Sequence, residues 1–336
     1  VPRFVRALQR ASLKRSPMIV ALKSTQNGNT PMKTLMLSGV AAFAFAGAAA
    51  ASCPVVLNAD ANGAFPGQFE LAEFEAANSC ELSFAGNPEA AALAAMIEGM
   101  GEIPAAAADR LPAEPLVVAP YAEIGTYGGT LNGLSNATEA GTSDLLSVRH
   151  VNFFRFSDDL ATIVPNVAKA WSWNADYTVL TVELREGHKW SDGNDFTAED
   201  VAFWYNDMVM DTNIIASPKG RFLSAEKPWT VEAKDATTVV ITLNAPKPGL
   251  VAQFATDYAQ PFQPSHLLKQ FHPAHNADAD KLAQFLGLET GYDVINLYYG
   301  QSDWKDVPQP ILKNPEVAAK LVEAGFTAVA PTLESH

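Results

Sequence analysis

The sequence predicts an α/β fold, in which strands and helices are mixed along the chain, and three segments carry this prediction. Residues 177–185 (YTVLTVELR) alternate apolar and polar side chains, which is typical of a strand with one buried face. Residues 197–208 begin with polar residues suited to capping a helix and continue with apolar residues at helical spacing. Residues 230–243 (TVEAKDATTVVITL) show the alternation and the central turn of a β-hairpin.

Length, composition and charge restrict the classes of protein to which the chain can belong. Its 336 residues suffice for two domains or one large one. With 48% hydrophobic and 18% charged residues, it is neither a disordered chain nor a coiled coil. The 37 acidic residues exceed the 23 lysines and arginines, giving a net charge of -14. Because this surplus repels phosphate backbones, we expect no nucleic-acid partner.

The first segment has the pattern of an export signal. Residues 1–59 hold no acidic residue and seven basic ones. Residues 32–51 (MKTLMLSGVAAFAFAGAAAA) have a basic start, an apolar middle and small residues at the end, so we interpret them as a signal peptide. A transmembrane anchor is the alternative, but the stretch is Ala-rich and interrupted by Ser38 and Gly39. Residues 1–31 are interpreted as an upstream segment that is not translated.

The two cysteines, Cys53 and Cys80, leave three interpretations open. In an oxidising compartment they can form one disulfide, which is the interpretation we favour. Cleavage after Ser52 would instead expose Cys53 to lipid modification, although the preceding residues lack the leucine expected for that signal. A zinc site fits least well, because no CxxC spacing or paired histidine motif supplies the other ligands.

Residues 52–120 are predicted to be an N-terminal extension and linker, with helices over 69–77 and 88–100. A tract with four prolines follows and predicts an extended connection, because proline removes a backbone donor: Pro104, Pro112, Pro115 and Pro120. We place a domain boundary near Pro120, so that residues 121–336 form the second region. There, Gly128 and Gly129 precede a short strand that starts at Thr130.

The expected elements of residues 121–336 follow from local patterns. In the strand at 177–185, Leu180, Val182 and Leu184 share one face. Asp192 and Gly193 predict a turn. Thr197 and Asp200 predict a helix start, and an apolar face follows at Val201, Trp204, Tyr205 and Met208. The hairpin should turn near Asp235 and Ala236, with helices over 249–257, 266–271, 279–287 and 315–324 and a last strand within FTAVAPTLESH.

No residue pattern indicates catalysis, a metal or a cofactor. The chain lacks a phosphate-binding glycine loop, a GxSxG elbow and an HExxH motif. His266, His272 and His275 lie near Asp278, but they share no helix face, so we expect exposed or helix-capping histidines. Asp192, Asn194 and Asp195 predict a turn, because the later ligands of a calcium loop are missing. The six tryptophans (171, 173, 190, 204, 229 and 304) predict mainly core packing, with some lining a ligand cleft.

Residues 184–204 (LREGHKWSDGNDFTAEDVAFW) closely resemble the signature of extracellular solute-binding proteins of family 5, the peptide, dipeptide and nickel receptors of bacterial ABC importers. The resemblance extends from about Tyr127 to the end, through YGGTLNGLS, NFFRFSDD, IVPNVAKAWSWNADYTVLTVELR and VEAKDATTVVITLNAPKPG. It implies a periplasmic-binding-protein type II-like fold whose first lobe has a mixed β-sheet with flanking helices. Such receptors bind ligand in a cleft between two lobes that close by a hinge motion.

The resemblance also implies a function and candidate residues. We expect the substrate-binding component of an ABC importer, a periplasmic monomer that delivers a peptide or similar small solute to an inner-membrane permease, with no cofactor and no catalysis. The loop containing Ser135, Asn136, Ala137 and Thr138 matches the family position near the cleft, and four further candidates are Phe154, Arg155, Tyr258 and Gln260. Because family members are usually longer, we expect residues 121–336 to be an incomplete first lobe. The alternative function is an exported hydrolase of peptides or carbohydrates, supported by the carboxylates and tryptophans.

Overall fold

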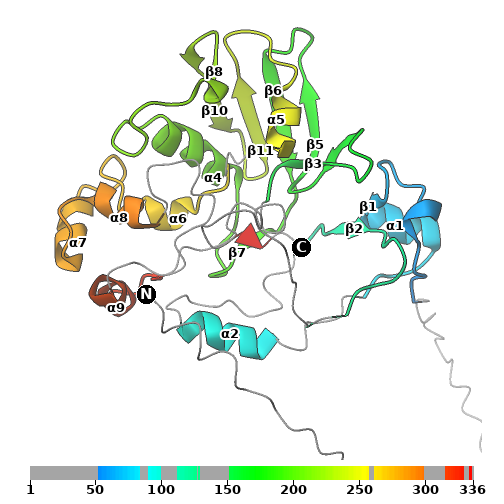
Figure 1. Ribbon diagram of the computed structural model, residues 1–336, viewed down its shortest axis with the longest axis horizontal. Coiled ribbons are helices and arrows are strands. Elements are labelled where there is room, and N and C mark those ends of the chain that lie inside the picture. Colours follow the sequence, from blue (N-terminus) through cyan, green and yellow to red (C-terminus); the bar gives the residue numbers. More distant parts are fainter. Residues whose placement is uncertain are drawn as a thin grey trace, which may run out of the picture. The chain divides into compact units, whose positions relative to one another are not determined.

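The computed structural model describes residues 52–83, 90–99, 112–126, 128, 151–256, 261–298, 315–328 and 333–334 (Figure 1). Its largest sheet has four antiparallel strands in the order β10-β11-β6-β5. They are β5 (Ala168–Trp173), β6 (Val179–Leu184), β10 (Thr230–Ala233) and β11 (Thr238–Thr242). The other named strand pairs in these ranges are also antiparallel. A mixed sheet needs at least one parallel pair, and none of the named pairs in the described ranges is parallel.

The centre of this sheet confirms the predicted strand alternation. On β6, Leu180 and Val182 are fully buried, whereas Glu183 is exposed on the other face. Their partners on β11 are Ile241 and Val239, which are also fully buried. Since side chains alternate across a strand, this register brings the apolar set of both strands to the core side. The turn between β10 and β11 falls where it was predicted.

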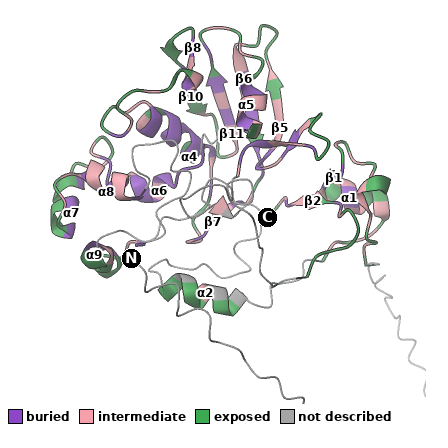
Figure 2. Cartoon of the chain, viewed as in Figure 1, coloured by how far each residue is buried: buried purple, intermediate pink, exposed green. Residues whose placement is uncertain are grey.

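The helix after the signature begins and packs as predicted. Thr197 and Asp200 form a capping box at the start of α4 (Ala198–Phe203), with each side chain bonded to the backbone of the other residue. The chain then widens into a π-helical segment, η4 (Trp204–Val209), a deviation that the spacing did not indicate. The predicted apolar face is buried throughout, and most of α4 is buried in Figure 2.

The remaining helices of this region are short. Four were predicted, namely α5 (Leu250–Thr256), α6 (Ser265–Leu268), α7 (Ala279–Leu286) and α9 (Pro315–Glu323). A further helix, α8 (Gly291–Tyr298), was missed, although Val294, Ile295 and Tyr298 recur at helical spacing and are buried. Together with Phe203, Phe271 and Leu321, these side chains form a second apolar cluster beside the one under the sheet.

Short strand pairs complete the fold around the sheet. They are β3 (Phe154–Phe156) with β4 (Ile163–Pro165), β7 (Lys189–Trp190) with β12 (Leu333–Glu334), and β8 (Leu223–Ser224) with β9 (Lys227–Pro228). Two single turns of 3-10 helix are η1 (Asn58–Asp60) and η5 (Gly220–Phe222). Of the predicted last strand, Leu333 and Glu334 form β12, whereas Phe326 to Ala328 are not in a strand. The predicted strand near Thr130 lies outside the described residues.

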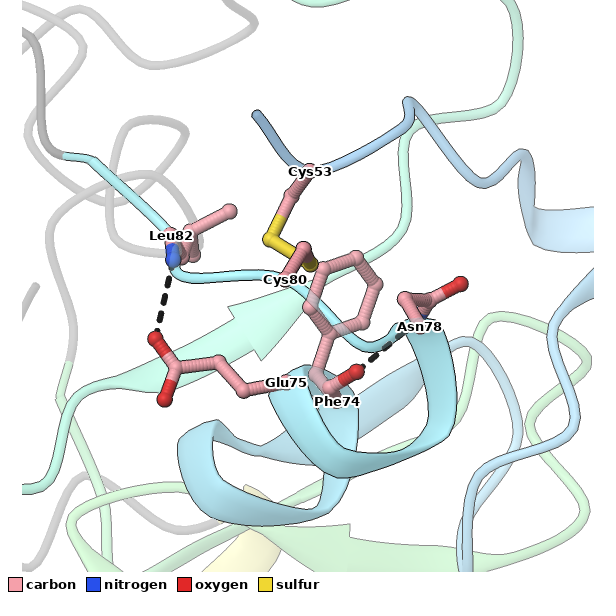
Figure 3. The surroundings of a disulfide bond; sticks show 6 residues. All are labelled: Cys53, Phe74, Glu75, Asn78, Cys80 and Leu82. Atoms are coloured by element: carbon pink, nitrogen blue, oxygen red, sulfur yellow. Dashed lines mark hydrogen bonds between the residues drawn. A yellow bond between two sulfur atoms is a disulfide. The ribbon is translucent and has the colours of Figure 1, made fainter. Parts of the chain in front are cut away.

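The N-terminal extension forms a small unit of its own secondary structure. It contains β1 (Gln68–Glu70), α1 (Leu71–Asn78), α2 (Ala90–Gly99) and β2 (Leu116–Val118), with β1 antiparallel to β2. A disulfide joins Cys53 to Cys80, whose Cα atoms are 5.0 Å apart (Figure 3). Of the proline tract, the structure describes residues 112–120, where Leu116–Val118 are extended and pair with β1 in a two-stranded sheet. None of the helices in the described ranges has both the length and the apolar character that crossing a membrane needs.

Candidate functional site

The candidate ligand residues fall into two groups. Ser135, Asn136 and Thr138 in one loop, and Tyr258 and Gln260 in another, lie outside the described residues. Phe154 and Arg155 are adjacent on β3, and since neighbouring residues of a strand point to opposite faces, their environments differ.

Phe154 belongs to the core. Its side chain is fully buried, and its ring lies 4.6 Å from the ring of Trp171 and 6.0 Å from that of Phe153. It presents no exposed surface to a ligand in this structure. Trp171 is only partly buried and also stacks on Phe65 of the extension at 6.2 Å, so an aromatic row joins the extension to β3 and β5.

Arg155 is the member of the pair that reaches solvent, with 32% of its side chain exposed. One terminal nitrogen donates to Oε1 of Gln68 at 2.9 Å, and the other lies 3.5 Å from a carboxylate oxygen of Asp158. These two contacts orient a guanidinium that has five N–H donors in a plane. Such a group recognises carboxylates through paired hydrogen bonds.

Gln68 is a residue of this site that the sequence did not reveal. Its side chain is buried; its Nε2 donates to the carbonyl oxygen of Pro165 at 3.0 Å while its Oε1 accepts from Arg155. It therefore joins β1 to both strands of the β3–β4 hairpin. Because 87 positions separate Gln68 from Arg155, no local pattern in the sequence could have indicated the contact.

Tyr121, which directly follows the extension, also reaches this hairpin. The side chains of Tyr121 and Asp158 are hydrogen bonded, and this bond is the main cause that raises the pKa of Tyr121 above 10.0. Asp159 is held by Ser157, whose hydroxyl donates to it at 2.5 Å, and this bond is the main cause that lowers the pKa of Asp159. The hairpin therefore carries an ordered acidic tip beside Arg155.

The signature segment is organised around a buried carboxylate. Asp200 is 2% exposed and accepts hydrogen bonds from Trp190 Nε1 at 3.3 Å, from the backbone N–H of Thr197 at 2.9 Å and from the backbone N–H of Ser265 at 2.9 Å. Burial raises the pKa of Asp200 and outweighs the opposite effect of these donors. This carboxylate joins β7, α4 and α6 and is enclosed, so its role is structural.

The turn at Asp192 is confirmed and has a further contact. The backbone N–H of Gly193 donates to the carbonyl of Trp190 at 2.8 Å, and Gly193 has φ +88°, a conformation that favours glycine. The carboxylate of Asp192 lies 2.8 Å from Nε2 of His266. Lys189, in the preceding strand, is paired with Asp195.

The prediction of exposed or capping histidines is wrong for His272, which is 1% exposed. Its Nε2 lies 3.0 Å from the carbonyl of Asp207, and its Nδ1 accepts from the backbone N–H of Ala274 at 3.2 Å. His275 is partly exposed and pairs with the carboxylate of Asp207 at 2.9 Å. Sequence periodicity could not show this, because the partners lie in η4. In the described ranges, no three His, Cys, Asp or Glu side chains are grouped so that they could hold a metal ion.

Among the tryptophans that the structure describes, most belong to the core, as predicted. Trp190, Trp204 and Trp229 are buried, and Trp229 stacks on Tyr205 with ring centroids 5.1 Å apart. Trp171 and Trp173 are partly buried at the edge of the sheet.

Comparison with known proteins shows a similarity over part of the chain. Residues 162–292 match the family model described as bacterial extracellular solute-binding proteins, family 5 Middle. The chain is 29% identical over 197 residues to the periplasmic alpha-galactoside-binding protein of Rhizobium meliloti (strain 1021), and 36% identical over 99 residues to the periplasmic oligopeptide-binding protein OppA of Salmonella typhimurium (strain LT2). These matches cover 52% and 25% of this chain, but only 28% and 18% of the two relatives.

A solved structure of an oligopeptide-binding protein OppA shares the fold. It superimposes with a TM-score of 0.55 at 28% sequence identity, over 68% of this chain and 35% of that protein. The described lobe thus has the α/β fold of type II periplasmic binding proteins. The matched residues 162–292 contain the signature segment and the four-stranded sheet, so this part of the chain is similar to the bacterial extracellular solute-binding proteins, family 5.

Proposed function

We propose that this chain is the substrate-binding component of an ABC importer, which captures a peptide or similar small solute outside the inner membrane and delivers it to the permease. The observation that carries the proposal is the family match over residues 162–292 on a fold shared with OppA. The matched relatives are named as binding proteins. In this proposal the chain acts as a monomer by binding and presentation, without chemistry.

Arg155 is the basis for preferring a peptide over a sugar. The names of the relatives give oligopeptides and alpha-galactosides as ligands. A peptide carries a terminal carboxylate, whereas an α-galactoside carries no charge. The partly exposed guanidinium of Arg155, oriented by Gln68 and Asp158, offers the group that would pair with that carboxylate. Ser135, Asn136, Thr138, Tyr258 and Gln260 are proposed to contact the rest of the ligand.

The disulfide supports a periplasmic location. Disulfides form and persist in oxidising compartments such as the bacterial periplasm. The Sγ atom of Cys53 is bonded to Cys80, and the same atom cannot also carry a lipid thioether. We therefore propose export without a lipid anchor at Cys53, and mass spectrometry of the mature N-terminus tests this. A diacylglycerol adduct on Cys53 would contradict it.

The test of function is to incubate the purified protein with a mixture of short peptides and, separately, with α-galactosides. Gel filtration then removes free ligand, and mass spectrometry identifies what is retained. We expect intact peptides to be retained in preference to α-galactosides and to peptides with an amidated C-terminus. Replacing Arg155 with Ala should abolish the preference for the free carboxylate, whereas S172A, an exposed position on β5, should leave it unchanged.

Three outcomes would contradict the proposal in different ways. Retention of α-galactosides alone would overturn the choice of ligand but keep the class of protein. Detection of cleaved peptides or glycans, together with loss of turnover when one carboxylate is replaced, would favour the exported hydrolase. Retention of no solute by the protein, in either mixture, would overturn the binding function of this chain.

A further inference from the structure

The N-terminal extension has too small a core to be held by packing alone. Its buried apolar side chains in the described ranges are Phe69, Phe74 and Ala119, whereas the cluster under the main sheet has 24. Small units of this kind usually depend on a disulfide for stability. The Cys53–Cys80 bond lies beside the ring of Phe74, and it closes a loop that contains β1 (Figure 3). The disulfide is thus a covalent constraint on the position of β1, in addition to its pairing with β2 and the hydrogen bonds of Gln68.

Strand β1 supplies the counter-ion of a buried arginine in the lobe. Arg185 belongs to the signature segment and is 2% exposed. Its two terminal nitrogens donate to the two carboxylate oxygens of Glu70, and its Nε donates to the carbonyl oxygen of Asn166 at 2.7 Å. A buried cation that loses its hydrogen-bonded anionic partner is strongly destabilising, because the desolvation cost remains.

A second acidic residue of the extension also pairs with a basic residue of the lobe. Residues 52–120 contain 10 acidic residues and one basic residue. Besides Glu70, Glu114 pairs with Lys169 of β5 at 3.0 Å. Next to Arg185, two segments of the backbone lie close together. A Cβ added to Gly187 would lie 2.5 Å from the backbone nitrogen of Ala113. The extension is thus fitted to a basic edge of the lobe.

We propose that the Cys53–Cys80 disulfide controls the stability of the lobe, by holding Glu70 against Arg185. Formation of the bond removes two protons and two electrons from the two thiols, and a disulfide-containing oxidant accepts them and becomes a dithiol. In the reduced chain β1 is held only by its noncovalent contacts, and Arg185 is left without its carboxylate for part of the time. If the chain is exported as proposed above, the lobe reaches full stability only after it leaves the reducing cytoplasm.

The test is amide hydrogen exchange of the purified protein, read by mass spectrometry on peptides from residues 179–186 and from residues 68–82. Dithiothreitol reduces the disulfide, and its own two thiols become a cyclic disulfide. We expect reduction to speed exchange in both peptides, by roughly tenfold or more at 179–186, since the buried Arg185 has lost its carboxylate partner. The variant with both Cys53 and Cys80 replaced by Ser should match the reduced protein.

Variants at the ion pair separate the proposal from a general loosening. The oxidised E70Q protein should exchange at 179–186 as fast as the reduced wild type, and reduction should add little. R185L removes the cation, so its exchange at 179–186 should not respond to reduction. E73Q is the matched control, because Glu73 accepts a hydrogen bond from Ala64 within the extension; it should respond to reduction as the wild type does.

Two results would overturn the proposal. In the first, reduction of the wild type speeds exchange at 68–82 and leaves 179–186 unchanged. In the second, E70Q responds to reduction at 179–186 as strongly as the wild type, which would mean that the disulfide acts on the lobe by another route. E70Q keeps the test decisive even if R185L does not fold.

Discussion

The backbone N–H of Ser265 donates to Oδ1 of Asp200 at 2.9 Å, although 65 positions separate the two residues. The other carboxylate oxygen of Asp200 accepts from Thr197 and Trp190. One buried side chain thus caps α4, holds the first turn of α6 and receives the indole N–H of β7. Breaking this arrangement leaves several buried donors without an acceptor, which costs more than a single exposed hydrogen bond.

Replacing Asp200 with Asn tests this arrangement. Asparagine keeps one oxygen and replaces the other with an NH2 group, so either Ser265 or the pair Thr197 and Trp190 loses its acceptor. We expect the free energy of unfolding to fall by about 2–3 kcal/mol, measured by urea denaturation. In the control E199Q, the exposed pair of Glu199 with Lys269 is lost, and the change should stay within about 1 kcal/mol. Equal losses in the two variants would contradict the structural role of Asp200.

Asp192 gives a prediction for acidic pH. Burial raises the pKa of this carboxyl group, but the hydrogen bonds and charge of His266 and the hydrogen bonds of Asn194 outweigh burial, so that its pKa lies below 3.8. Its contribution to stability is therefore present above pH 3.8 and is lost as the pH falls through the lowered pKa.

The measurement for Asp192 compares the wild type with D192N in urea denaturation at several pH values. The wild type should be the more stable protein near neutral pH, and the difference should shrink progressively below about pH 3.8. A difference that grows on acidification would mean that the pKa of Asp192 is raised in the folded state.

Tyr205 gives the corresponding prediction for alkaline pH. Its hydroxyl donates to the carbonyl of Phe222 at 2.7 Å and accepts from the backbone N–H of Trp229 at 2.6 Å, and burial raises its pKa to about 12. In Y205F two buried backbone groups lose a partner, so we expect a loss of about 1–3 kcal/mol near pH 8. Because the folded pKa is raised, this advantage of the wild type is full below pH 10.0 and declines as the pH rises toward 12. Urea midpoints that keep a constant separation up to pH 12 would contradict the assignment.

We predict that replacing Leu160, at the tip of the β3–β4 hairpin, with glycine stabilises the protein. It has φ +59° and is 77% exposed, so a side chain occupies a backbone conformation that favours glycine and gains no burial. We expect L160G to raise the free energy of unfolding by about 0.5–1 kcal/mol, with a higher Tm. A161G, at the next position, where φ is not positive, is the control and should be destabilising. A lower Tm for L160G would show that the leucine side chain makes a stabilising contact.

The candidate ligand site shows where sequence patterns stop being informative. Phe154 and Arg155 were among the candidates that the sequence offered, and the strand geometry explains why only Arg155 reaches solvent. Gln68 could not have been predicted, because its contacts to Arg155 and Pro165 depend on how the extension packs against the hairpin. His272 was predicted incorrectly for the same reason, since its burial depends on η4 and α8.

By itself the sequence determined several local elements and the resemblance to family 5 of the solute-binding proteins. The alternation of β6 and the capping box at Thr197 each involve residues only a few positions apart, so the pattern of side chains is enough to specify them. The tertiary structure alone decided that Glu70 neutralises Arg185 across 115 positions. An ion pair between distant segments has no periodic signal in the chain, because it depends on where the folded backbone brings the two charges.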